Sequence, residues 1–66
     1  MCEFKVFLKN GGADEKILII REIVAAKQEA GDVILMNILG NSRRVEGAAI
    51  ESFNTMNQEL ILVQKA

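Results

Sequence analysis

The stretch ILIIREIV, residues 17–24, decides the fold of this chain. Five of its eight residues are β-branched, and such side chains favour the pleated surface of a strand. A helix is the alternative for residues 14–30, because Asp14 could cap its start and apolar residues recur there at helical spacing. The β-branched content favours strands, and we predict one strand at 16–20 and another at 23–29.

Strand-like segments also lie on both sides of this stretch. Residues 4–9 alternate between apolar and polar with a period of two, except at Phe7, and residues 33–38 and 60–63 are almost continuously apolar. Turn signals rich in Gly, Asn, Asp and Ser separate these segments, at residues 10–12, 30–32, 40–42 and 54–57. The pattern predicts one all-β domain over residues 1–66, a small barrel of about six short antiparallel strands.

Length and composition together predict a homodimer. A chain of 66 residues buries only about 60% of the surface that its unfolded form exposes, so its own core is marginal. With one Cys and no His, the chain cannot form an internal disulfide or a histidine-based structural zinc site. Continuously apolar strands are typical of sheets that are covered on both faces, and a second copy of the chain would supply the missing cover.

Charge and hydropathy argue against several classes of partner. Eight basic and nine acidic residues give a net charge of −1, which does not favour binding to a phosphate backbone. The longest apolar runs have four residues, far from the ~20 needed to cross a bilayer, and residues 1–9 lack the pattern of a secretory signal. We therefore expect a cytoplasmic protein with no membrane partner, in which the thiol stays reduced.

The single cysteine, Cys2, carries most of the functional information. A thiolate is a soft ligand for thiolate-bound nickel, copper or zinc, and a two-fold dimer would present Cys2 twice. The α-amine of Met1, the amide nitrogen of Cys2 and its sulfur could form adjacent chelate rings; if Met1 is removed, the new α-amine and the sulfur of Cys2 could form one such ring. Mixed nitrogen and sulfur donors of this kind suit Ni(II) and also Cu(II). A small buried hydrophobic side chain is the alternative interpretation of Cys2.

Catalysis and RNA binding are the competing functions. A cysteine nucleophile needs a base or a positive neighbour, and the chain has no histidine, so we do not expect an enzyme. A small β-barrel RNA-binding module is the alternative function, but Arg43-Arg44 is the only adjacent basic pair, and no Tyr or Trp is present for stacking. Nucleic acid is therefore not the favoured partner.

Five segments of the chain together form a recognisable family pattern. The first is residues 1–11, with a Met-Cys start, an alternating segment and a glycine turn. The other four are residues 31–35, 39–40, 45–47 and 59–63. Through these segments the chain resembles the CooT family of small nickel-binding proteins along almost its whole length.

This resemblance implies a homodimeric small β-barrel that binds nickel through the cysteine at the second position. It further implies a metallochaperone or metal-buffering role in the maturation of a nickel enzyme, such as carbon monoxide dehydrogenase. Only Cys2 matches the metal-binding motif of the family, so the expected metal site consists of Cys2 from both subunits, with Met1 as an additional donor and Ni(II) as the metal. The family usually has an acidic residue where Asn37 stands.

Overall fold

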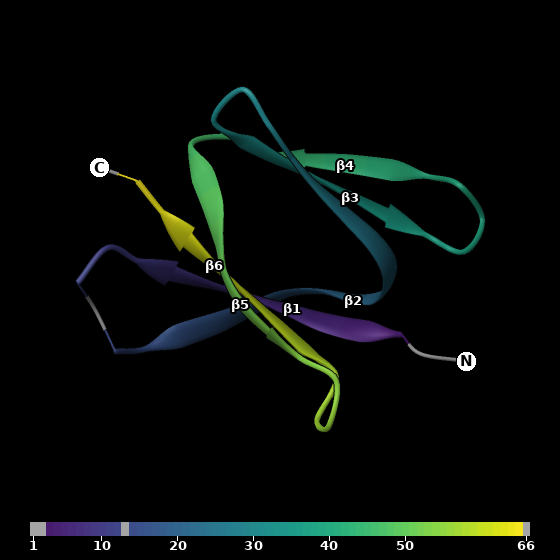
Figure 1. The fold of residues 1–66 in the computed structure, drawn as a ribbon, viewed down its shortest axis with the longest axis horizontal. Coiled ribbons are helices and arrows are strands. Elements are labelled where there is room, and N and C mark those ends of the chain that lie inside the picture. Colours follow the sequence, from purple (N-terminus) through teal and green to yellow (C-terminus); the bar gives the residue numbers. More distant parts are fainter. Residues whose placement is uncertain (1–2, 13, 66) are drawn as a thin grey trace.

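The computed structural model describes residues 3–12 and 14–65 and contains six strands in these ranges. The strands are β1 (Phe4–Asn10), β2 (Lys16–Glu29), β3 (Asp32–Asn37), β4 (Ser42–Val45), β5 (Ala48–Asn54) and β6 (Glu59–Gln64). They form one sheet in the order β4-β3-β2-β1-β6-β5, which curls into a half-barrel (Figure 1). The predicted all-β fold with six strands is confirmed. None of the described segments forms a helix that is long and apolar enough to cross a membrane.

Residues 17–24 lie within β2, which is one strand of 14 residues where two strands were predicted. Glu22, a non-glycine residue, has a φ of 62°, and the β1–β2 register shifts nearby. Such a bulge bends a strand without ending it. The bend lets residues 16–23 pair with β1 and residues 23–29 pair with β3. The irregularity at residues 21–22 was therefore predicted at the right place, but it is a bulge inside a continuous strand.

The first and last strands meet in the middle of the sheet and run parallel. Their pairing extends from Lys5↔Glu59 to Asn10↔Gln64. All other strand pairs are antiparallel, as predicted. The parallel pair joins the meander of β1 to β4 to the hairpin of β5 and β6, so the two ends of the chain hold the sheet together.

The core lies on the concave side of the curled sheet and is wholly apolar. Four of its side chains are completely buried, namely Val6, Val33, Leu35 and Leu62. Ile23, Ala48 and Leu60 complete the buried cluster. Inside β3 and β6 the residues that follow the buried ones are also apolar and are only partly covered, namely Ile34, Met36, Ile61 and Val63. The continuous apolar runs thus arise from a buried inner face and an incompletely covered outer face.

A glutamine side chain bridges the open side of the half-barrel. Gln28 Nε2 donates to the carbonyl oxygens of Asp32 at 3.0 Å and Ala48 at 3.1 Å. Its Oε1 accepts a hydrogen bond of 3.0 Å from the backbone N–H of Ile50. The backbone adds one direct bond, from Ala48 N–H to the carbonyl of Gly31 at 3.2 Å. β2 and β5 are not neighbours in the sheet, so the amide of Gln28 takes the place of a strand ladder between them.

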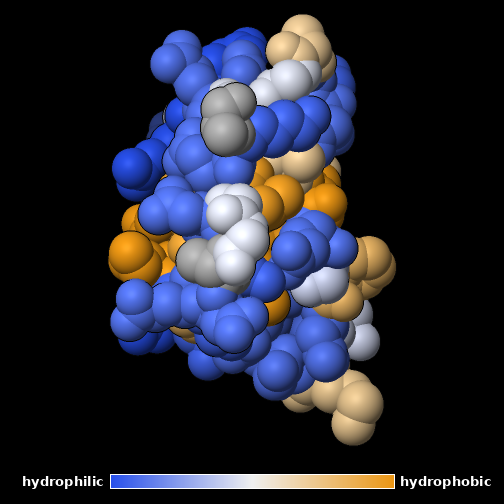
Figure 2. All heavy atoms as spheres, turned by 90° about the vertical axis from the view of Figure 1, so that its left-hand side faces the viewer, coloured by the Kyte–Doolittle hydropathy of each residue, from blue (hydrophilic) through white to orange (hydrophobic). Residues whose placement is uncertain are grey.

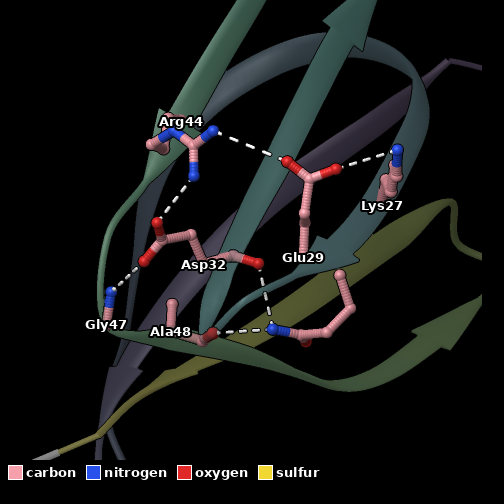
Figure 3. Close-up of polar contacts among 7 residues, drawn as sticks. Lys27, Glu29, Asp32, Arg44, Gly47 and Ala48 are labelled. Atoms are coloured by element: carbon pink, nitrogen blue, oxygen red, sulfur yellow. Dashed lines mark hydrogen bonds and ion pairs between the residues drawn. The ribbon is translucent and has the colours of Figure 1, made fainter.

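An ion-pair network fastens the β3–β4 hairpin to the turn that follows it (Figure 3). Arg44 lies 2.6 Å from Asp32 and 3.6 Å from Glu29, which also pairs with Lys27 at 2.9 Å. The N–H of Gly47 donates to Asp32 at 3.0 Å; this bond, followed by the Arg44 guanidinium, lowers the pKa of the Asp32 carboxyl. Lys27 and then Arg44 lower the pKa of Glu29, and the hydrogen bond to Asp32 raises the pKa of Arg44.

Candidate metal site at the start of β1

The two predicted donor residues, Met1 and Cys2, lie outside the described residues. The structure describes the chain from Glu3, and β1 begins at Phe4. The surroundings of the candidate site are therefore defined by the end of the sheet at which β1 starts. The prediction that Met1 and Cys2 supply the metal donors stays a prediction.

The register places three strands at the same level at this end of the sheet. Phe4 of β1 pairs with Ile23 of β2, and Ile23 pairs on its other side with Asn37 at the end of β3. On the opposite side of β1, Lys5 pairs with Glu59 and donates its backbone N–H to the carbonyl of Gln58 at 2.9 Å. The start of β1 is thus anchored to both neighbouring strands, β2 and β6.

An apolar groove opens beside the start of β1. Its volume is about 380 Å³. It is lined by Phe4, by Ile23, Val24, Ala25 and Ala26 of β2, by Ile50 and Phe53 of β5, and by Leu60 of β6. Phe53 is 67% exposed at the groove, and Val24 is also exposed. The sheet therefore presents an uncovered hydrophobic face beside Phe4, the first residue of β1.

The described residues hold no second candidate for a metal site. Within residues 3–12 and 14–65, no group of three or more Asp or Glu side chains is placed to hold a metal ion. Met56 is 94% exposed at the β5–β6 turn. Met36 is partly exposed and lines a shallow groove between β2, β3 and β4.

Asn37 organises the turn after β3 with its side-chain oxygen. Its Oδ1 accepts hydrogen bonds of 3.0 Å from the backbone N–H groups of Leu39 and Asn41. A carboxylate at this position, as the family resemblance implies, offers the same kind of acceptor. The oxygen at position 37 therefore has a structural task in this chain, which the sequence alone did not reveal.

The basic pair considered for RNA binding, Arg43 and Arg44, does not present two free positive charges, because Arg44 is in ion pairs. Arg44 is engaged with Asp32 and Glu29, so its charge is largely compensated. Phe4 is half-buried, and the ring of Phe7 is covered by the ammonium of Lys16, 4.5 Å from its centroid. A continuous basic surface with interleaved stacking rings does not arise from these residues.

The fold defines a small all-β protein, built from one curled sheet. The chain matches the family model described as CO dehydrogenase accessory protein CooT over residues 1–63, and it belongs to this CooT family. No curated protein matches the chain.

A solved structure confirms the fold assignment. The chain is similar to the crystal structure of a protein assigned as CooT from Carboxydothermus hydrogenoformans, with a TM-score of 0.77. The two chains are 20% identical, and the similarity covers 98% of this chain and 100% of the other. Two CooT chains with such different sequences thus share the curled β sheet.

Proposed function

We propose that this member of the CO dehydrogenase accessory family is a homodimer that binds one Ni(II) ion between the Cys2 residues of its two copies. Its role would be to carry or buffer nickel for the maturation of carbon monoxide dehydrogenase, without catalysis of its own. Membership of a family described by its accessory role to that enzyme supports the assignment of the client.

The apolar groove beside the start of β1 is the observation that carries the proposal. A second copy seated on this face would cover Phe4, Val24 and Phe53 and would bring the two chain starts together at the symmetry axis. Three side chains from each copy would be buried. If each contributes half of the free energy of full burial, the total is roughly 5–10 kcal/mol. This is of the same order as the roughly 4–15 kcal/mol that association costs, so further apolar surface around the groove must contribute.

The donor chemistry of the chain start suits nickel. A thiolate with an amine or amide nitrogen in the same plane is a donor set that Ni(II) accepts well, and two copies of Cys2 double the number of sulfur donors. Both thiol and amine must lose protons before they bind, so nickel uptake releases protons and weakens as the pH falls.

Titration with nickel tests this function. The wild-type chain should bind one Ni(II) per two chains, with sulfur-to-metal charge-transfer absorption, and Cys2→Ser should lose this tight binding while it keeps its far-UV spectrum. A variant that combines Cys2→Ser with Ser52→Cys is the matched control, because it moves the thiol to an exposed position on β5. Full nickel affinity in either variant contradicts the proposal.

A further inference from the structure

The turn between β3 and β4 presents two adjacent aliphatic side chains to solvent. Ile38 is 53% exposed and Leu39 is 81% exposed. A single exposed leucine is ordinary in a soluble protein, but two neighbouring aliphatic side chains at the tip of a hairpin form a compact apolar protrusion. Neither side chain belongs to the buried core cluster, and neither lines the groove beside β1.

This turn is held in one conformation by a dense set of hydrogen bonds. The Oδ1 of Asn37 accepts from two backbone N–H groups, those of Leu39 and Asn41. The backbone adds Gly40 N–H to the carbonyl of Asn37 at 3.0 Å and Asn37 N–H to the carbonyl of Asn41 at 3.1 Å. Gly40 has a φ of 86°, which a glycine adopts without strain. The two aliphatic side chains are therefore presented on a preorganised support.

The turn projects from the same end of the sheet as the start of β1. Phe4, Ile23 and Asn37 lie at one level on adjacent strands, and adjacent strands are about 4.8 Å apart. Two strand spacings therefore separate the start of β1 from the end of β3, roughly 10 Å along the sheet. Figure 1 shows both on the same side of the molecule.

The other end of the molecule has a different surface. It carries the β1–β2 turn and the end of β6, and Figure 2 shows mostly hydrophilic residues there, with hydrophobic ones in an interrupted band across the middle. The second protruding hairpin tip, between β5 and β6, lies at the same end as the start of β1, because Lys5 pairs with Glu59, but it carries the single exposed Met56 among polar neighbours and no adjacent pair of aliphatic side chains. The paired aliphatic protrusion is thus specific to the end at which β1 starts.

We propose that Ile38 and Leu39 form the docking element for the enzyme that receives the metal, nickel-free carbon monoxide dehydrogenase, and that they insert into an apolar recess on its surface. This inference rests on the proposed function, because only a protein that delivers an ion from the chain start must bring this end against its client. A rigid protrusion loses little conformational entropy on docking, and an aliphatic anchor at the centre of an interface supplies much of its affinity.

The test compares two hairpin tips in binding to nickel-free carbon monoxide dehydrogenase. The double variant Ile38→Ser with Leu39→Ser should bind the purified enzyme roughly 10- to 100-fold more weakly than the wild type, by calorimetry or surface-based kinetics. Met56→Ser, at the β5–β6 tip, is the matched control and should bind as the wild type does. Both variants should keep wild-type nickel affinity and the wild-type sedimentation coefficient.

Each other outcome overturns a distinct part of the account. Unchanged enzyme binding by the double variant overturns the docking element, and so does a weakened dimer, since the tip would then belong to the contact between copies. A wild-type chain that binds nickel but not the enzyme overturns the docking element and leaves nickel binding intact. A wild-type chain that binds the enzyme through this tip but takes up no nickel supports the docking element and overturns the proposed function.

Discussion

Replacing Gln28 by alanine should open the half-barrel and lower its stability. The side chain makes three hydrogen bonds across the gap between β2 and β5, to the carbonyls of Asp32 and Ala48 and from the N–H of Ile50. Alanine removes all three, and among the described residues only the backbone bond from Ala48 to Gly31 then joins the β2–β3 turn to β5 directly.

The magnitude follows from the number of bonds and their exposure. A net hydrogen bond contributes about 0.5–1.5 kcal/mol, and only the bond to Ala48 is partly buried, so values in the lower half of this range apply to the others. The expected loss in the free energy of unfolding is therefore about 2 kcal/mol. For a domain of this size, such a loss lowers the melting temperature by roughly 8–16 °C.

Thermal and urea unfolding, followed by circular dichroism, measure this loss. Gln28→Glu keeps the acceptor for the N–H of Ile50 but loses both donated bonds. Its free energy of unfolding should therefore lie between those of the Gln28→Ala variant and the wild type, or below both. Asn57→Ala, in the exposed β5–β6 turn, is the neutral control and should stay within about 0.5 kcal/mol of the wild type. All variants must be compared at one protein concentration, because the proposed dimerisation would add to stability. A Gln28→Ala variant as stable as the control refutes the bridging role.

Three further predictions concern the interface, the metal and the ion-pair network. Phe53→Glu should convert the proposed dimer to a folded monomer, because it places a charge in the apolar groove; sedimentation of a dimer as tight as the wild type would contradict this. Nickel affinity should fall steadily between about pH 8 and 6, since thiol and amine must deprotonate, and a flat profile in calorimetric titrations would argue against both donors. The lowered pKa of Asp32 means that its stabilising contribution is complete above the ordinary value of 3.8 and is lost as the pH falls through the lower pKa of the folded state. Asp32→Asn should therefore be less stable than the wild type at neutral pH, and the difference should shrink in acid; equal unfolding curves at pH 7 would exclude this role.

The strands could be predicted because their cause is local. The β-branched residues of 17–24 favour a pleated conformation wherever they are placed, and the glycine and asparagine turns separate the segments in the order that the sheet requires. The bulge at Glu22 was visible only as a polar interruption. Whether such an interruption ends a strand or bends it depends on two partners, β1 and β3, that lie elsewhere in the chain.

The missed features are those that depend on distant parts of the chain. The parallel pairing of β1 and β6 joins the two ends of the sequence, and no local pattern encodes it. Gln28 reads as a polar residue on a strand, but its hydrogen bonds reach the backbone of residues 48–50. The turn built by Asn37 had a sequence signal, an asparagine three residues before Gly40, but this signal does not show which side chains the turn exposes.

For the site, the sequence supplied a hypothesis about the donors, Met1 and Cys2, which stays a prediction. The lone thiol at position 2 and the family resemblance indicated a metal site shared by two copies, and membership of the CooT family is confirmed. The groove of Phe4, Val24 and Phe53 could not be predicted, because it is formed where β1, β2 and β5 converge in the folded sheet. Phe53 in particular stands in a polar context in the sequence, and only the fold places it beside the start of β1.

X-ray absorption at the nickel edge of the loaded protein tests the central claim most directly. Two sulfur donors per nickel ion, together with nitrogen donors, are expected when the metal is shared by two chain starts. A single sulfur per nickel, or a shell of nitrogen and oxygen only, would contradict a site formed by Cys2 from both copies.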